Sequence, residues 1–281
     1  INKESKYLYL KIMQNFYYKI MQRIEISINK LLDNRLIFIY SGDDARQSEY
    51  CLKNFFISPA HYLRHTSYYT ESKDNIKRNN IKIINKIAYS IYSVNPDIMN
   101  VLPKRTKFLP YPYRLESDSY NIKNNKTLKI AHVPSHRGVK GTKLIIDKIK
   151  NLKINKPELN INLTIVENID HSELLRKLED FDLVIDQILV GWYGSIAVES
   201  MAKGIPVMAY LRNKDMKFVP IKMQKDMPII NISINNLEKK IIEFCKFDQE
   251  ELFNLSKRSK EFVRNWHSLN YCAESLKDDL F

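Results

Sequence analysis

Glycine is scarce in this chain, with only six among 281 residues. The six fall in three short regions: Gly42; Gly138 and Gly141; Gly191, Gly194 and Gly204. Glycine is needed where φ is positive or where another group must approach the backbone closely. The three regions are therefore the first candidates for a ligand site.

Cysteine and long apolar runs are also few. The three cysteines, Cys51, Cys245 and Cys272, are far apart, odd in number and without metal-ligand spacing, and the six histidines show no such spacing either. We expect reduced thiols in a cytoplasmic protein. No apolar run approaches the ~20 residues of a membrane span, and no signal peptide is visible. Because the first residue is Ile1 rather than Met, we expect the sequence to begin inside a longer chain.

The net charge of the chain is strongly positive, at +13. Lysine and asparagine are abundant throughout, as in proteins from AT-rich genomes, and no RNA-binding signature, zinc spacing or basic helix-turn-helix pattern is present. A nucleic-acid partner is therefore not expected, whereas an anionic small substrate or a membrane surface is compatible with the charge. Residues 7–32 have apolar positions at helical spacing, which predicts a long amphipathic helix. Packing of this helix on a sheet is favoured over a place on a membrane surface.

The order of predicted elements indicates an α/β protein. A strand at 36–40 runs into a polar loop, residues 51–83 are irregular and polar, and a further strand signal covers 84–92. Later the predicted strands are 128–133, 161–166, 183–185, 206–210 and 228–232, and the predicted helices 142–152, 171–179, 195–203 and 237–245. Such alternation predicts a mostly parallel sheet covered on both faces. We expect a first domain at 1–112, a linker at 113–126, a second domain at 127–249 and a helical tail at 250–281.

The stretch from Asp186 to Tyr210 is the centre of the prediction. It reads as the end of a buried strand, a glycine-containing loop, a short helix from Ser195, a stop at Gly204 and a second buried strand. The free N–H groups and the dipole of a helix start form an anion site in α/β proteins. Asp186 and Gln187 follow the strand, and we expect them to order the loop rather than take part in chemistry.

Two loops together resemble family 4 glycosyltransferases. Residues 132–142, with Arg137, Lys140 and Gly141, are similar to that family's donor-domain loop, where an Arg and a Lys precede a Lys-Gly helix start. Residues 191–206 resemble its Phe/Tyr-Gly…Glu-Ala-Met-Ala-x-Gly-x-Pro segment. Residues 42–46 are similar to an acceptor-domain Gly-x-Asp-x-Arg, and residues 262–267 to the closing helix that crosses back onto that domain.

The resemblance implies a fold and an activity. Such enzymes have two facing Rossmann-like domains, the GT-B arrangement, and transfer a sugar from a nucleotide-diphospho-sugar donor with retention. The implied acceptor is a glycan or lipid-linked molecule of bacterial cell-surface polysaccharide synthesis, at the cytoplasmic side of the membrane. The first domain is short for a complete one, and we expect it to lack its first strands.

The resemblance also implies roles for individual residues. Arg137 and Lys140 would stabilise the departing diphosphate in place of a metal, so neither a metal nor a cofactor is expected. The donor-binding residues would be Gly138, Gly141, Gly191, Trp192, Tyr193, Gly194, Ser195 and, at the ribose, Glu199. Asp43, Arg46 and His61 would lie on the acceptor side.

One position departs from the family pattern. The first glutamate of its Glu-x7-Glu motif, which touches sugar hydroxyls, corresponds to Gly191, whereas the second is matched by Glu199. Backbone amides of residues 191–193 or the Trp192 ring would then hold the sugar. The departure leaves other functions open: a non-catalytic nucleotide-sugar-binding partner protein, or another GT-B enzyme such as a nucleotide-sugar epimerase or a glycerol-phosphate polymer transferase. A basic nucleic-acid binder ranks last.

Overall fold

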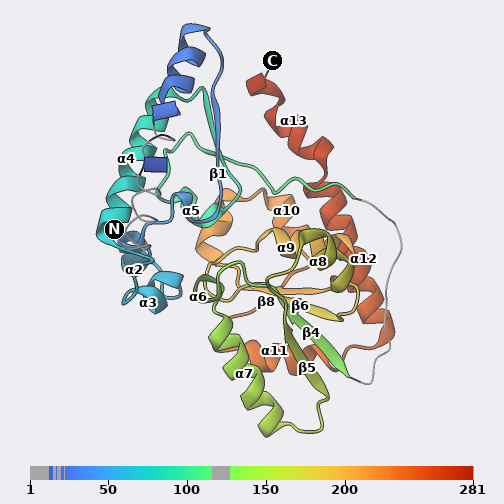
Figure 1. Ribbon diagram of the computed structural model, residues 1–281. Helices are drawn as coiled ribbons and strands as arrows, with labels where there is room; N and C mark the ends of the chain where they lie inside the picture. Colours follow the sequence, from blue (N-terminus) through green and yellow to red (C-terminus); the bar gives the residue numbers. More distant parts are fainter. Residues whose placement is uncertain (1–12, 15–16, 18–19, 22, 116–126, 281) are drawn as a thin grey trace.

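The computed structural model describes residues 13–14, 17, 20–21, 23–115 and 127–280. These residues form two lobes, each built around its own parallel sheet (Figure 1). Every strand pairing between named strands is parallel. The predicted α/β class with parallel sheets is therefore confirmed.

The first lobe has a three-stranded sheet in the order β1-β2-β3. Its strands are β1 (Ile37–Tyr40), β2 (Ser90–Ser93) and β3 (Lys107–Phe108). The helices around them are a 3-10 turn η1 (Gly42–Asp44), α2 (Ser48–Asn54), α3 (Pro59–Leu63), α4 (Glu71–Ile87) and α5 (Pro96–Met99). The central strand β2 is buried along its whole length and forms the centre of the core of this lobe.

Helix α4 corrects two predictions. It occupies much of the stretch expected to be irregular, and its last turn covers residues 84–87, which were assigned to a strand. The helix starts where the Thr70 hydroxyl accepts a hydrogen bond from the Lys73 N–H, a common N-cap arrangement. Its polar sequence conceals the helical period because only Asp74 and Ile81 are buried.

The second lobe has a five-stranded sheet in the order β5-β4-β6-β7-β8. Its strands are β4 (Leu128–His132), β5 (Ile161–Ile165), β6 (Leu183–Ile185), β7 (Val207–Ala209) and β8 (Ile230–Asn231). The helices are α6 (Arg137–Lys140), α7 (Thr142–Asn155), α8 (His171–Leu178), α9 (Ser195–Ala202), the 3-10 segment η2 (Asn213–Phe218), α10 (Ile221–Asp226) and α11 (Leu237–Phe244). All nine elements predicted after residue 127 are present within a few residues.

Apolar side chains point to both faces of this sheet and pack in two separate cores. Val184 of β6 packs in a core with Met201 of α9 and Phe262 of α12 (Gln249–Trp266). Its neighbours along the strand, Leu183 and Ile185, pack in the opposite core, which α7 and α11 cover. Alternate burial on two faces is what a central parallel strand requires, and it confirms that helices cover both sides.

The C-terminal part of the chain is helical, as predicted, and contacts both lobes. Helix α12 packs against α9 of the second lobe. Helix α13 (Leu269–Leu280) lies against the first sheet, where Cys272 packs with Tyr92 and Leu109. The Asp279 carboxylate accepts hydrogen bonds from the Tyr92 hydroxyl and, at 2.8 Å, from the Lys107 ammonium. These contacts link the end of the chain to the first lobe.

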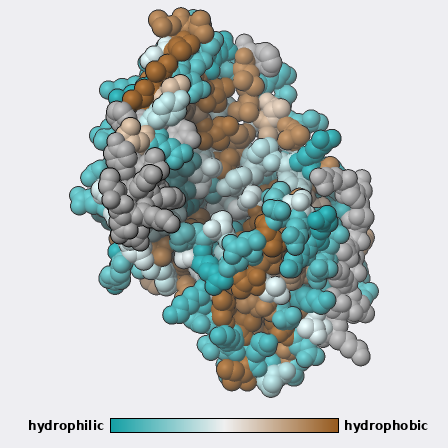
Figure 2. All heavy atoms as spheres, in the orientation of Figure 1, coloured by the Kyte–Doolittle hydropathy of each residue, from teal (hydrophilic) through white to brown (hydrophobic). Residues whose placement is uncertain are grey.

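The described residues between 13 and 31 are helical, as the spacing predicts. Residues 7–12, 15–16, 18–19 and 22 of the predicted helix lie outside the described part. The expectation that this helix packs on a sheet is wrong for the residues described, because its large apolar side chains are exposed: Met13, Tyr17, Ile20, Met21, Ile24, Ile28 and Leu31. Figure 2 shows hydrophobic atoms gathered along the upper edge of the molecule, where this helix lies in Figure 1.

Candidate active site

The candidate site lies where the order of the second sheet reverses. After β4 the chain passes outward to β5 and then returns to β6 on the other side of β4. Ligands of open α/β sheets bind at such a point, beyond the carboxyl ends of the two strands. The loop after β4 leads to Arg137 and Lys140, and the loop after β6 leads to Gly194 and Ser195. The two loops that were singled out in the sequence are therefore brought together.

Buried His132 fixes the base of the first loop. One ring nitrogen lies 2.7 Å from the Ile185 carbonyl oxygen, and the other lies 2.9 Å from the Thr142 hydroxyl. Burial lowers the pKa of His132 to about 4. The neutral ring donates through Nδ1 to the carbonyl and accepts at Nε2 from the hydroxyl, so it braces β4 against β6 and α7.

Lys140 and Gly194 meet at one buried carboxylate. The Lys140 Nζ lies 2.5 Å from Asp186 Oδ1, and the Gly194 N–H donates to Asp186 Oδ2 at 2.5 Å. The Gln187 amide donates to the Trp192 carbonyl. The prediction that Asp186 and Gln187 order the loop is thereby confirmed. The carboxylate also holds the ammonium beside the start of α9.

The first cavity lies in the second lobe and has a volume of about 510 Å³. Its lining includes Arg137, Lys140, Ser195 and Glu199 among the predicted residues, together with Ser135, Glu167 and His171. Arg137 is exposed at the mouth and forms a two-point ion pair with Glu167, with Nη2–Oε1 and Nε–Oε2 distances of 2.6 and 2.9 Å. Glu199 is nearly buried and lies 3.1 Å from the His171 ring.

The second cavity, of about 270 Å³, lies between the lobes. The first lobe contributes Gly42, Asp43, Arg46, Tyr68 and Asn95, and the second contributes Ser135, His136, Lys140, Gly194 and Ser195, with Tyr111 between them. Ser135, Lys140 and Ser195 also line the first cavity, so the two spaces meet at these residues. Predicted residues of both domains, Asp43 and Arg46 of the first and Lys140, Gly194 and Ser195 of the second, therefore face one continuous site.

Charged groups on the first lobe are tightly coupled at this cleft. Asp43 accepts hydrogen bonds from the hydroxyls of Tyr68 at 2.5 Å and Tyr69 at 2.8 Å, and from Arg46. Burial raises the pKa of Asp43, but Arg46 and the two tyrosines outweigh burial and lower it below its usual value. Asp43 is thus a charged hydrogen-bond acceptor. Arg46 also binds Asp97 at 2.9 Å, and its buried Nη2 has no partner in the described structure.

Two predicted donor-binding rings lie elsewhere. Trp192 and Tyr193 are buried in the core of the second lobe and stack on each other with ring centroids 4.3 Å apart. The Tyr193 hydroxyl is 2.9 Å from His267, whose pKa burial lowers to about 4. Neither residue lines the two cavities, so the expectation that the Trp192 ring holds a sugar is wrong.

The departure at Gly191 has a steric cause. Its φ is +89°, and a Cβ atom there would lie 2.6 Å from the guanidinium of Arg212. The Arg212 side chain therefore occupies the space that any side chain at position 191 would enter. Gly138 and Gly141 are constrained too. A Cβ atom at Gly138 would lie 2.6 Å from the Leu63 side chain, and one at Gly141 would lie 2.5 Å from the Ile188 side chain. Whether these glycines bind a donor stays a prediction.

The histidine that lines the interlobe cavity is His136 of the second lobe, whereas His61, predicted for the acceptor side, does not line it. The His61 ring is 2.8 Å from the Ser58 hydroxyl and lines neither cavity. His136 caps α6 by accepting from the Val139 N–H, and its ring contacts Tyr68 of the other lobe with centroids 4.3 Å apart. His136 lies inside the loop of residues 132–142 that resembles the family's donor-domain loop. Its position in that loop is the sequence signal that could have predicted its place at the cleft.

Among the residues that the structure describes, no three His, Cys, Asp or Glu side chains are placed to hold a metal ion. Within the same described part, no helix has the length and apolar character needed to cross a membrane.

The fold has counterparts among solved structures. A TarM variant from S. aureus with Fondaparinux, alpha-GlcNAc-glycerol and UDP has a TM-score of 0.58 at 14% identity, over 90% of this chain and 53% of that one. Anabaena HepE with UDP-glucose has a TM-score of 0.57 at 12% identity, over 92% and 75%. Sucrose-phosphate synthase from Thermosynechococcus elongatus has 0.55 at 15%, over 90% and 74%.

The chain has the GT-B fold. It spans about half the length of TarM. No protein-family model matches the sequence, and no curated protein does. At identities of 12–15% the likeness concerns the GT-B fold, and membership of family 4 and the incompleteness of the first domain stay predictions.

Proposed function

We propose that this chain is a glycosyltransferase that uses a nucleotide-diphospho-sugar donor. The observation that carries the proposal is the junction of the two cavities at Ser135, Lys140 and Ser195. A nucleoside in the larger cavity would place its diphosphate at this junction and its sugar between the lobes. UDP is the first nucleotide to test, because the TarM and HepE structures hold UDP and UDP-glucose.

The junction suits the leaving group of such a transfer. When the bond between the sugar and the diphosphate breaks, negative charge grows on the diphosphate, and preorganised cations and N–H groups lower the barrier. An ammonium has three N–H donors, so Lys140 keeps two after it binds Asp186. The first N–H groups of α9, from Ser195, add the positive end of the helix dipole. Neither contribution requires a metal.

The remaining groups match the other parts of the donor and acceptor. Glu199 would accept hydrogen bonds from the ribose hydroxyls, and Arg137 would turn from Glu167 toward the diphosphate. On the opposite wall, the charged Asp43 offers an oxygen acceptor to sugar or acceptor hydroxyls, whereas the Asn95 carbonyl oxygen already accepts from the Gly42 N–H and the Tyr111 hydroxyl. We further propose retention at the anomeric carbon, transfer of a hexose, and a glycan or lipid-linked acceptor in bacterial cell-surface polysaccharide synthesis.

The test is release of the nucleotide diphosphate from UDP-sugars, with product stereochemistry read by NMR. We expect hydrolysis or transfer by the wild-type chain and loss of at least ~100-fold in kcat on removal of the Lys140 ammonium, the range seen for single groups that stabilise a transition-state charge. Turnover that persists without this ammonium would contradict the assigned role. An inverted product would contradict retention alone.

A nucleotide-sugar-binding protein without turnover is the second candidate. The observation that favours it is Arg212, which fills the place of a side chain at Gly191 and so excludes a carboxylate that would touch sugar hydroxyls. This candidate predicts stabilisation by nucleotide-sugar and no release of product with any acceptor. Release of a nucleotide diphosphate would decide for the enzyme.

We also propose that the protein works at the cytoplasmic face of a membrane. The support is the exposed apolar face of the N-terminal helix, including Ile24 and Ile28, on a chain of net charge +13. An amphipathic helix in a basic protein binds anionic lipid surfaces. Cosedimentation with phosphatidylglycerol vesicles tests this, and we expect the double change Ile24→Glu and Ile28→Glu to abolish it. Binding unchanged by this variant would contradict the proposal.

A further inference from the structure

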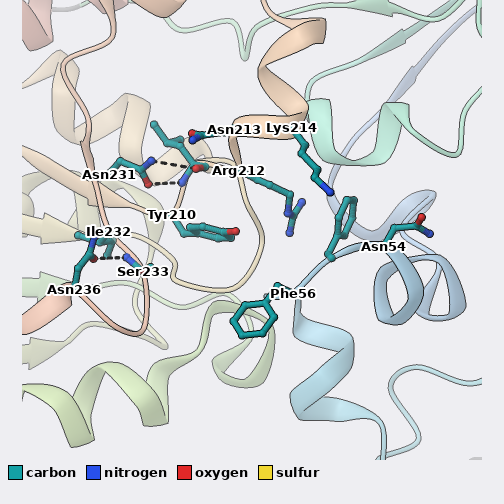
Figure 3. A pocket seen from close by; sticks show the side chains of 12 residues that line it. Asn54, Phe56, Tyr210, Arg212, Asn213, Lys214, Asn231, Ile232, Ser233 and Asn236 are labelled. Carbon is teal, nitrogen blue, oxygen red and sulfur yellow. Dashed lines mark hydrogen bonds between the residues drawn. The ribbon is translucent and has the colours of Figure 1, made fainter.

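A third cavity, of about 360 Å³, lies at the junction of the lobes and shares no lining residue with the proposed donor site. The first lobe contributes residues 54–56, at the end of α2, and the second contributes the segment after β7 and the segment that begins at the end of β8. Figure 3 shows Tyr210, Arg212 and Lys214 reaching from the second lobe toward the segment of the first lobe that carries Phe56. The size is at the lower end for ligand pockets, which suits a single sugar unit.

Arg212 supplies a buried donor at this cavity. Its Nη1 binds Asp215 at 2.7 Å, and its Nη2 donates to the Ile57 carbonyl at 2.8 Å. The residue is 6% exposed, and its Nε has no hydrogen-bond partner in the part of the chain described. A buried N–H without a partner is costly, and a ligand oxygen in the cavity would relieve that cost.

The charge of the lining is positive. Among the twelve lining residues there is no Asp or Glu, whereas Arg212 and Lys214 are cations. Asp215 offsets much of the Arg212 charge. Lys214 is exposed and has no ion pair with any residue that the structure describes. The uncompensated charge at the rim is therefore that of Lys214, and it favours an anionic group.

The walls combine aromatic rings with fixed polar groups. Phe56 is 90% exposed, so its ring stands open beside Tyr210. The walls are rigid because Asn231 exchanges two hydrogen bonds with the Leu211 backbone, at 2.9 and 3.1 Å. The C–H groups of a pyranose face carry partial positive charge and pack on the negative face of an aromatic ring. Sugar hydroxyls match the amide and hydroxyl groups around it.

We propose that this cavity binds a sugar unit that carries a carboxylate or a phosphate. The sugar ring packs on Phe56, and the anionic group lies between Lys214 and the Arg212 Nε. The site is separate from the proposed transfer site, because none of its lining residues lines the two donor-side cavities. A saccharide bound there spans both lobes and holds them together.

The experiment is a titration by isothermal calorimetry and saturation-transfer NMR with glucuronic acid, glucose 6-phosphate and neutral glucose. We expect saturable binding of both charged sugars, tighter than that of glucose. Phe56→Ala should weaken all three by about 3- to 10-fold, the range of one aromatic contact. Lys214→Ala should weaken only the charged sugars, by about 2- to 5-fold at low salt. Ile221→Ala, which removes an exposed side chain outside the lining, is the matched control.

Competition identifies the site. We expect binding to persist in the presence of saturating UDP, since the cavities are separate. Displacement of glucose 6-phosphate by UDP would place it in the donor site and overturn the proposal. The absence of saturable binding, or binding that Phe56→Ala and Lys214→Ala leave unchanged, would overturn it as well. Because Phe56 and Lys214 are exposed, both variants should fold, which the unchanged melting temperature verifies.

Discussion

The Lys140 ammonium lies 2.5 Å from a carboxylate, that of Asp186, which is entirely buried. The same carboxylate holds the Gly194 N–H. The chain thus holds the Lys140 ammonium and the loop that leads into α9 around one internal anion. Asp186 fixes their positions before a ligand arrives. The same ion pair also contributes to the stability of the fold.

This pairing makes the single variant Lys140→Ala unstable. Loss of the ammonium leaves the Asp186 carboxylate buried without its cation, which typically costs about 3–5 kcal/mol. The double variant Lys140→Met with Asp186→Asn removes both charges and should recover most of that loss in urea unfolding. It should still show no stabilisation by UDP and no turnover. A double variant that keeps the UDP response would contradict the role of Lys140, and a single variant as stable as wild type would contradict the coupling.

We expect Glu199 to contribute to ligand binding rather than to the stability of the fold. Within the described part of the chain, the side-chain partner of its carboxylate is the exposed His171 ring at 3.1 Å, so Glu199→Ala should shift the apo melting temperature by less than about 2 °C. The dissociation constant of UDP should rise about 10-fold or more, as expected for hydrogen bonds to a charged group. His171→Ala is the matched control and should change the affinity less. A large loss of apo stability with intact nucleotide affinity would refute this assignment.

Stability should fall as the pH drops from about 6.5 toward 4. The folded-state pKa values of His132 and His267 are both lowered to about 4 by burial, against an ordinary value near 6.5. In this window the unfolded chain binds protons that the folded chain does not, so protonation favours unfolding. Each histidine contributes about 3 kcal/mol that is present above pH 6.5. Urea unfolding at pH 7, 6 and 5 measures the slope, and His132→Asn should reduce it. Equal stability at pH 7 and 5 would contradict both assignments.

Substitution of two glycines with positive φ would distinguish the cost of steric crowding from the cost of backbone strain. At Gly191 an added Cβ meets the Arg212 guanidinium at 2.6 Å, whereas at Gly42, with φ of +53°, nothing lies within 4 Å. Gly42→Ala should therefore cost about 1–2 kcal/mol for the backbone alone. Gly191→Ala should cost about 1–3 kcal/mol more, because a packed side chain must move. Equal unfolding free energies for the two variants would show that Arg212 does not occupy this space.

The second lobe was predictable because each of its elements carries a local signal. The Leu183–Ile185 run is short, apolar and followed by a loop, as a central parallel strand requires, and Ser195 follows a glycine at the helix start. The placement of Arg137, Lys140 and Glu199 around one cavity follows from the order of these elements. Parallel strands bring the loops at their carboxyl ends to one edge of the sheet.

The predictions that failed depend on long-range packing. Because Trp192 follows a loop glycine, the sequence predicts that its ring faces the site. In the structure the ring turns into the core, where it contacts the rings of Phe108 and Tyr193. The choice between His61 and His136 depends on how the lobes face each other. For α4, the Thr70 cap was a readable signal, but its isoleucines and asparagines have low helix propensity. In each case tertiary contacts decided the result.

The most direct test of the donor site is thermal unfolding with UDP, GDP, CDP, ADP and TDP. A nucleotide at 100 times its dissociation constant adds about 2.7 kcal/mol to the free energy of unfolding. We predict that one nucleotide, UDP first, raises the melting temperature of the wild-type chain and fails to do so in the Lys140→Met, Asp186→Asn double variant. If none of the five raises it, or if the double variant responds equally, the donor site does not lie at Lys140.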